Sequence, residues 1–191
     1  MAFPVFLDTC VLYPQNLCDL LLRIAESGVF RPHWSADVLE ELERNLGRAV
    51  PDAVDGARRR VSAMGRAFPE ADVEGYESLV DGMACDPKDR HVLAAAVHAG
   101  CQVIVTFNLK DFPAEALAPY SVVAVAPDDF LLDQLDLYPR QTLGALVGMS
   151  RSSSRPPLTP IQLLDSLARS GLPRFCAEVR RKSPDIGAWP N

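Results

Sequence analysis

The sequence predicts an α/β fold with a central, mostly parallel sheet and a helical extension in its C-terminal part. Short apolar runs typical of buried strands alternate with segments in which leucines recur at helical spacing. Acidic or amide side chains follow two of the predicted strands, at the edge where open α/β sheets bind ligands. With 191 residues, of which 48% are hydrophobic, the chain can bury one sizeable core.

The first strand is predicted at residues 5–7, a short apolar run that ends at Asp8 and Thr9. Asp8 is therefore expected at the carboxyl edge of the sheet, although an acid at this position could equally serve to cap the next helix. Residues 15–27 carry leucines and an isoleucine at helical spacing, and Gly28 is typical of the residue that ends a helix. We expect this helix to face the core.

A second strand is predicted at residues 29–34, and Ser35 is a preferred N-cap residue for the helix that follows. Glu41 flanks the apolar stripe of this helix. The sequence alone favours a solvated position for Glu41, while the helical geometry allows it to face a cleft beside the core. Residues 51–68 predict a helix with a basic face, and residues 69–83 predict an irregular, acidic connection.

Residues 86–112 read DPKDRHVLAAAVHAGCQVIVTFNLKDF and contain the most informative pattern of the chain. Asp86 followed by Pro87 is typical of a helix start, with the aspartate as N-cap and the proline in the first turn. Gly100 is the expected end of the helix. The pattern therefore predicts a helix at residues 87–99.

The apolar run at residues 103–105 predicts the next buried strand. A helix that leads into a neighbouring parallel strand runs antiparallel to it. Asp89 in the first turn of the helix should therefore lie at the same edge of the sheet as Asn108 and Asp111, which follow the strand. Asp8 is expected at that edge as well, so the acids should converge.

The C-terminal part predicts one more strand, at residues 122–125, followed by a helix. The stretch SRSSSRPP at 150–157 is rich in serine and proline, as a linker would be, and residues 160–182 predict one or two short helices. We therefore expect a first domain of residues 1–132 and a helical extension of residues 133–191.

Composition narrows the class of protein. No apolar segment approaches the roughly 20 residues of a membrane span, and the beginning MAFPVFLD lacks a basic leader, so we expect a cytoplasmic protein with no membrane contact. The five cysteines are an odd number without metal-type spacing, and we interpret them as reduced core residues.

The formal net charge of −6 argues against non-specific attraction to a polyanion. Binding of a nucleic acid would need local basic groups, and each candidate taken singly is interpreted as part of a solvated face. The candidates are Arg58, Arg59, Arg60, Arg66, Lys88, Arg90, Lys110, Arg180, Arg181 and Lys182.

A divalent metal ion is the simplest explanation for the converging acids. Clustered carboxylates repel one another unless they are protonated or neutralised, and oxygen ligands are those that Mg²⁺ or Mn²⁺ prefers. Such an ion can lower the pKa of a bound water and stabilise charge on a phosphate. No Ser-His-Asp arrangement, Gly-rich phosphate loop or zinc pattern competes with this interpretation. The histidines are interpreted as structural: His33, His91 and His98.

These residues resemble those of PIN-domain ribonucleases, specifically the VapC-type toxins of bacterial toxin–antitoxin pairs, over about residues 4–130. FLDTCVLY is similar to the family's opening strand with its first acid, SADVLEEL to the helix with the second, and residues 86–112 to the most specific segment. The resemblance implies a three-layer PIN-like nuclease domain. It implies the catalytic acids Asp8, Glu41, Asp89 and Asp111, and the metal ligands Asp8, Asp89, Asn108 and Asp111.

The resemblance further implies an endoribonuclease dependent on Mg²⁺ or Mn²⁺ that hydrolyses RNA phosphodiester bonds, with Glu41 positioning the water on the metal. It implies a small antitoxin protein that covers the site and inserts a basic side chain, and a homodimer. The family often has Asp where this chain has Asn108, which removes one negative charge. We therefore expect a single metal ion in the resting state.

Alternative functions stay open. A phosphatase of the haloacid dehalogenase kind needs a second acid two positions after the first, where this chain has Cys10. A PIN scaffold that only binds RNA or a partner is favoured by Asn108 and opposed by the retained acids. A housekeeping RNA-processing PIN nuclease would act without an antitoxin.

Overall fold

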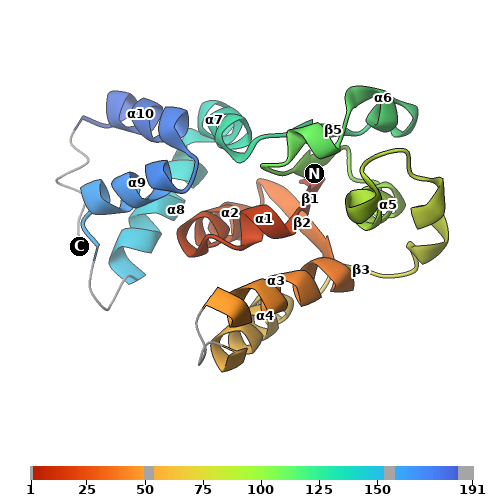
Figure 1. Ribbon diagram of the computed structural model, residues 1–191. Coiled ribbons are helices and arrows are strands. Elements are labelled where there is room, and N and C mark those ends of the chain that lie inside the picture. Colours follow the sequence, from red (N-terminus) through yellow and green to blue (C-terminus); the bar gives the residue numbers. More distant parts are fainter. Residues whose placement is uncertain (1, 50–53, 153–157, 185–191) are drawn as a thin grey trace. The chain divides into compact units, whose positions relative to one another are not determined.

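The computed structural model describes residues 2–49, 54–152 and 158–184, and their contacts divide the chain into two compact units. The first unit holds residues 2–13 and the described residues between 30 and 126, and the second holds residues 14–29 and the described residues from 127 onward. The elements are shown in Figure 1, and the two units are described separately below.

The first unit contains the five strands found in the described part of the chain. They are β1 (Phe3–Leu7), β2 (Phe30–Ser35), β3 (Asp72–Val73), β4 (Val103–Val105) and β5 (Val123–Val125). Its α-helices are α1 (Thr9–Leu12), α3 (Ala36–Ala49), α4 (Val54–Ala67), α5 (Arg90–His98) and α6 (Ala114–Leu117). Its 3₁₀ helices are η1 (Glu77–Gly82), η2 (Pro87–Asp89), η3 (Leu109–Asp111) and η4 (Ala118–Tyr120).

The sheet of the first unit has the order β3-β2-β1-β4-β5, and every neighbouring pair is parallel. The strand β1 lies at its centre, with Val5 opposite Val103 of β4 and Phe3 opposite Phe30 of β2. Val5 through Leu7 are fully buried, as expected for the apolar run of a central parallel strand. The predicted α/β fold with a parallel sheet is confirmed.

Because all strands are parallel, their carboxyl ends meet at one edge of the sheet. Asp8 directly follows β1, and Thr106 directly follows β4. The strand β2 ends at Ser35, whose Oγ accepts a hydrogen bond from the backbone N–H of Val38 at 3.4 Å, so the predicted N-cap of α3 is confirmed. This edge therefore brings together residues that are about 100 positions apart in the sequence.

The predicted helix before β4 forms in two parts, η2 and then α5. Oδ1 of Asp86 accepts from the backbone N–H of Lys88 at 3.1 Å, which confirms Asp86 as a cap. Gly100 has a φ of +68°, a conformation that favours glycine and ends the helix. Asp89, as the last residue of η2, is thereby fixed at the same edge as Asp8.

The connection predicted at 69–83 is less irregular than expected. It contains η1 and the short strand β3, whose Asp72 lies opposite Trp34 of β2. Two residues are too few to show the alternation that identifies a strand. The helix predicted at 51–68 is observed as α4, and residues 51–53 of that prediction lie outside the described residues.

The second unit is helical and includes a helix from the beginning of the chain. Its members are α2 (Gln15–Glu26), α7 (Pro127–Leu137), α8 (Pro139–Ser152), α9 (Pro160–Arg169) and α10 (Pro173–Lys182). The helix α2 packs on α8 and α9, while α10 packs on α7 and α9. Both carboxylate oxygens of Asp128 accept from the first backbone N–H groups of α10, at 3.1 Å from Arg174 and 2.8 Å from Phe175.

The expected boundary at residue 132 falls inside α7, because the buried residues Phe130, Leu131 and Leu135 pack this helix with the others of the second unit. The contacts therefore divide the chain at residue 126 instead. The linker expected at 150–157 begins inside α8, where Ser150 is buried, and its residues 153–157 lie outside the described part. None of the helices in the described ranges is long and apolar enough to cross a membrane.

Candidate functional site

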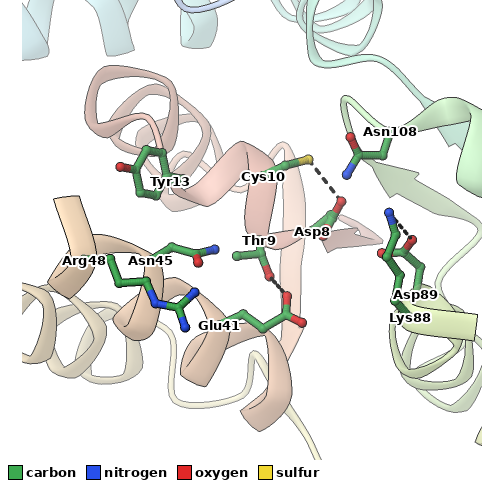
Figure 2. Close-up of a pocket in the computed structure, with 10 residues that line it drawn as sticks. All are labelled: Asp8, Thr9, Cys10, Tyr13, Glu41, Asn45, Arg48, Lys88, Asp89 and Asn108. Atoms are coloured by element: carbon green, nitrogen blue, oxygen red, sulfur yellow. Dashed lines mark hydrogen bonds and ion pairs between the residues drawn. The ribbon is translucent and has the colours of Figure 1, made fainter.

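A cleft of about 650 Å³ opens at the carboxyl edge of the sheet in the first unit (Figure 2). Its lining includes the predicted site residues Asp8, Glu41, Asp89 and Asn108. The fifth predicted residue, Asp111, contacts Lys88, which lines the cleft. Four of the five predicted residues therefore line one cleft, and Asp111 is joined to it through Lys88.

Asp8 is held between the ends of the two central strands. Its backbone N–H donates to the carbonyl of Val105 at 3.2 Å, which continues the β1–β4 ladder by one residue. Its Oδ2 accepts from the hydroxyl of Thr106 at 2.6 Å and from the thiol of Cys10 at 3.0 Å. Asp8 occupies the N-cap position of α1, but its side chain makes no capping hydrogen bond. The carboxylate is therefore directed to the cleft and not to the helix.

Cys10 lines the cleft instead of lying in the core as predicted. Burial, with the charge of Asp8 as a second cause, raises the pKa of its thiol to about 12. The thiol is therefore neutral and donates to Asp8, while its sulfur accepts from the backbone N–H of Phe107 at 3.2 Å. The other four cysteines are buried, as predicted.

Asp89 is a buried carboxylate without a full set of partners. Asp89 is 9% exposed, and its buried Oδ2 accepts no hydrogen bond from the described residues. Burial raises its pKa to about 6. The positive charge of Lys88 opposes this increase, and the negative charges of Asp8 and Asp111 add to it. A cation close to Asp89 would therefore lower the free energy of its ionised form.

Lys88 supplies such a positive charge in the structure. Its ammonium Nζ lies 3.1 Å from Oδ2 of Asp111 and 3.7 Å from Oδ2 of Asp89. Asp111 is itself buried, and its backbone carbonyl accepts from the N–H of Asp86 at 3.1 Å, which joins η3 to the start of η2. Lys88, interpreted from sequence as part of a solvated face, is instead the counter-ion of two predicted catalytic acids.

Glu41 lies on α3, on the side of Asp8 opposite Asp89 (Figure 2). Its Oε2 accepts from the hydroxyl of Thr9 at 2.9 Å, and its Oε1 lies 3.6 Å from Nε2 of His91. Glu41 therefore faces the cleft, which was one of the two positions that the sequence left open. Thr9 and His91 were missed as site residues, because only the fold brings them next to Glu41.

Asn108 lines the cleft two residues beyond Thr106. Its backbone N–H donates to the Thr106 hydroxyl at 2.9 Å, and that hydroxyl in turn donates to Asp8. Thr106 thus couples the backbone after β4 to the carboxylate after β1. A threonine among many gives no signal in the sequence, so this function was also missed.

The chemistry of these side chains fits a divalent ion that prefers oxygen ligands. The donors at the edge are three carboxylates and one amide, from Asp8, Asp89, Asp111 and Asn108, and one buried carboxylate oxygen has no hydrogen-bond partner among the described residues. As they stand, no three His, Cys, Asp or Glu side chains of the described part are close enough together to hold an ion. Lys88 contacts two of the acids instead. Displacing its ammonium would leave both carboxylates available to a metal.

Comparisons with known proteins agree with this fold. Residues 4–110 match the family model described as PIN domain, and residues 127–181 match the model described as VapC50 C-terminal domain. The curated protein named "Putative ribonuclease VapC50", from Mycobacterium tuberculosis (strain ATCC 25618 / H37Rv), is 52% identical over 110 residues.

The aligned region covers 58% of this chain and 64% of that relative, and no solved structure matches the chain. The PIN-domain match alone spans more than half of the sequence and includes Asp8, Glu41, Asp89 and Asn108. The resemblance noted from the sequence is thereby confirmed, and the chain belongs to the PIN-domain family.

Proposed function

We propose that this protein is a metal-dependent endoribonuclease that hydrolyses RNA phosphodiester bonds, and that it is the toxin of a type II toxin–antitoxin pair. The observation that carries the proposal is the state of Asp89. This carboxylate is buried in a cleft beside Asp8, has a raised pKa and keeps one oxygen without a hydrogen bond from the described residues. Such a group is costly for stability and typical of a functional site.

Asp8, Asp89, Asn108 and Asp111 would hold Mg²⁺ or Mn²⁺. When bound there, the ion would act as a Lewis acid toward a phosphate and lower the pKa of water. The hydrogen bond from Thr106 orients Asp8, and Cys10, as a neutral thiol, donates to the same oxygen. Asp8 is therefore preorganised in one orientation, whereas Asp89 and Asp111 have as their partner the ammonium of an exposed lysine side chain.

Glu41 is the group that would position the attacking water and accept its proton. Thr9 holds one of its oxygens, and the other faces His91 at 3.6 Å. The carboxylate of Glu41 is therefore fixed at the border of the cleft, beside the aspartates and not between them. The geometry supports separate roles, with the three aspartates holding the metal and Glu41 acting on the water.

The contact of Lys88 with Asp89 and Asp111 also supports the proposed antitoxin. It demonstrates that an ammonium group fits against these acids. A small antitoxin protein that covers the site could place its own basic side chain there. The relative at 52% identity carries the words ribonuclease and VapC50 in its name, which agrees with the proposed activity. Together with the toxin function, we propose that the protein is a homodimer and is located in the cytoplasm.

A PIN scaffold that only binds RNA or a partner is the second candidate. The ion pair of Lys88 with Asp111 favours it, because the ammonium neutralises the acids without a metal. The haloacid dehalogenase alternative is weaker, because the residue it needs as an acid is Cys10, a neutral thiol that donates to Asp8.

Cleavage of mixed RNA by the parent protein, in Mg²⁺, in Mn²⁺ and with a chelator, tests the proposal. We expect cleavage with either metal and none with the chelator. Asp8→Asn and Asp89→Asn should each lower the rate by about 100-fold or more while the circular dichroism spectrum stays that of a folded protein. An inactive parent that still binds RNA would identify the binding scaffold. Unchanged rates in both variants would show that the site is assigned wrongly.

A further inference from the structure

The cleft extends beyond the acids to a second group of side chains, Tyr13, Asn45 and Arg48 (Figure 2). We infer that this group, called here the distal subsite, binds one nucleotide of single-stranded RNA beside the phosphate to be cut. The inference rests on the proposed nuclease function and names the side chains that would hold the nucleotide next to the phosphate to be cut. Its evidence is the position of Tyr13, the spacing of residues along α3 and the positive charge of Arg48.

Tyr13 presents an aromatic ring at a fixed point of the cleft. It is the residue that ends α1, and it is 39% exposed although it lines the cleft. Arg60 of α4 donates to the carbonyl of Tyr13 at 3.1 Å and to that of Leu12 at 2.5 Å. These bonds satisfy the C-terminal carbonyls of α1 and hold the backbone of Tyr13 in place. The ring is therefore presented by a rigid backbone and is free to contact a ligand.

The helix α3 connects the distal subsite to the acidic end of the cleft. Glu41, Asn45 and Arg48 are spaced four and three residues apart, so they lie on one face of the helix, and all three line the cleft. Arg48 lies about 10 Å farther along the helix axis than Glu41. A ligand that reaches Arg48 from the acidic end must therefore be longer than a single phosphate group.

The chemistry of the distal subsite matches a nucleotide. Arg48 offers a guanidinium to a phosphate in a protein whose formal net charge is −6, so its attraction is local. The ring of Tyr13 offers a face on which a base can stack, and the amide of Asn45 can both donate to and accept from a base edge. The cleft volume of about 650 Å³ is sufficient for a group of this size.

A base can reach Tyr13 only if it is not stacked inside a duplex. In a double helix the bases are stacked on one another, whereas the unstacked bases of loops and single strands can lie against aromatic side chains. The distal subsite is therefore expected to select single-stranded over double-stranded RNA.

The test measures binding of a labelled, mixed-sequence oligoribonucleotide by fluorescence anisotropy, with Ca²⁺ in place of Mg²⁺, and KM for its cleavage in Mg²⁺. Tyr13→Ala should weaken binding by about 5- to 100-fold and Tyr13→Phe should not. The matched control is Tyr120→Ala, which changes a tyrosine of similar exposure, 37%, outside the cleft lining, and should bind like the parent.

An abasic nucleotide placed at each position of the oligonucleotide in turn identifies the stacked base. One position should weaken binding to the parent and have no further effect in Tyr13→Ala, because both changes remove the same stacking contact. Arg48→Ala should lower the slope of log affinity against log salt by about 1. Its control is Arg31→Ala, an exposed arginine near the amino end of β2, away from the edge that holds the cleft.

The outcomes separate this inference from the proposed function. If the parent binds and cleaves single-stranded RNA but Tyr13→Ala behaves like the parent, the distal subsite is wrong and the nuclease proposal stands. Equal affinity for duplex RNA would overturn the subsite in the same way. If the parent neither binds nor cleaves RNA, the proposed function fails and the distal subsite fails with it.

Discussion

The ammonium of Lys88 lies 3.1 Å from Oδ2 of Asp111, so a side chain of the protein itself contacts a proposed metal ligand. The same nitrogen is 3.7 Å from Asp89. The negative charge of Asp111, through this hydrogen bond, raises the pKa of Lys88, so the ammonium is fully charged at neutral pH. A metal ion must therefore displace this positive charge or bind beside it.

Lys88→Met should tighten the binding of Mg²⁺ and Mn²⁺ by a few-fold, since it removes the competing cation from Asp89 and Asp111. Isothermal titration calorimetry of parent and variant measures this directly. Lys110→Met is the matched control. Lys110 is exposed like Lys88 and lies in η3, but it has no ion pair with these acids among the described residues. Equal tightening in both variants would assign the effect to net charge alone.

Asp89→Asn should stabilise the metal-free protein at neutral pH. The pKa of Asp89 is raised to about 6 in the folded state from an ordinary value of 3.8, mainly by burial. The folded state then binds the proton more tightly than the unfolded state does, so the stability that depends on this proton is present below pH 4 and lost as the pH rises through about 6. The asparagine variant does not undergo this loss.

Urea unfolding with a chelator, at pH 4 and pH 7.5, checks the expectation. The variant should be more stable than the parent at pH 7.5 by roughly 1 to 2 kcal/mol, which is less than the full pKa change would give because solvent and Lys88 screen the charge. The difference should shrink at pH 4. A parent that is more stable than the variant at pH 7.5 would show that the ionised carboxylate is well satisfied without metal.

Asp86 and Asp89 should differ in what their substitution costs. Oδ1 of Asp86 caps the first turn at the N–H of Lys88, so Asp86→Ala should lose about 0.5 to 2 kcal/mol of stability as a missing N-cap. Its cleavage rate per folded molecule should stay near that of the parent, whereas Asp89→Asn should be inactive and folded. Combined unfolding and cleavage assays distinguish the two. Loss of activity in Asp86→Ala with intact stability would place Asp86 among the metal ligands.

Asn108→Asp should tighten metal binding and lower the metal concentration needed for cleavage. The aspartates Asp8, Asp89 and Asp111 bring three negative charges, which suffice for one divalent ion. Two ions roughly 3.5 to 4 Å apart would need more negative charge to offset their repulsion. We expect one metal in the resting state of the parent, and the gain should be clearest for Mg²⁺, which gives up its waters reluctantly.

The control for this variant is Asn45→Asp, which adds the same charge to the distal part of the same cleft. Calorimetric titration should show tighter binding for Asn108→Asp than for Asn45→Asp. Two tight metal sites in the parent, or equal effects of the two substitutions, would contradict the assigned role of Asn108.

Local signals explain which parts of the fold were predictable. The strand at 103–105, the cap at Asp86 and the helix end at Gly100 each follow from a few adjacent residues, and the rule that parallel strands end at one edge then placed Asp8 near Asn108. The partners of the acids had no such signal. Thr106 meets Asp8 across 98 positions of sequence, only because β1 and β4 pair in one register.

The site also uses residue types that sequence reasoning treats as ordinary. Lys88 is one of 19 basic residues, and nothing in its neighbourhood sets it apart before the fold brings Asp111 beside it. The leucine spacing of α2 showed that the helix buries one face, but it contains no information on which helices cover that face. For this reason the grouping of α2 with residues beyond 127 was not predicted.

That grouping has a consequence for a chain leaving the ribosome. The helix α2 is complete at Glu26, yet it packs on α8 and α9, which end at Ser152 and Arg169. Because synthesis proceeds at about 5 to 20 residues per second, these partner helices are made on the order of 10 seconds after α2. During that time they do not cover its leucine face. Nascent chains and truncations after residue 126 thus expose an apolar helix near their N-terminus, where a chaperone or another unfinished copy can bind it.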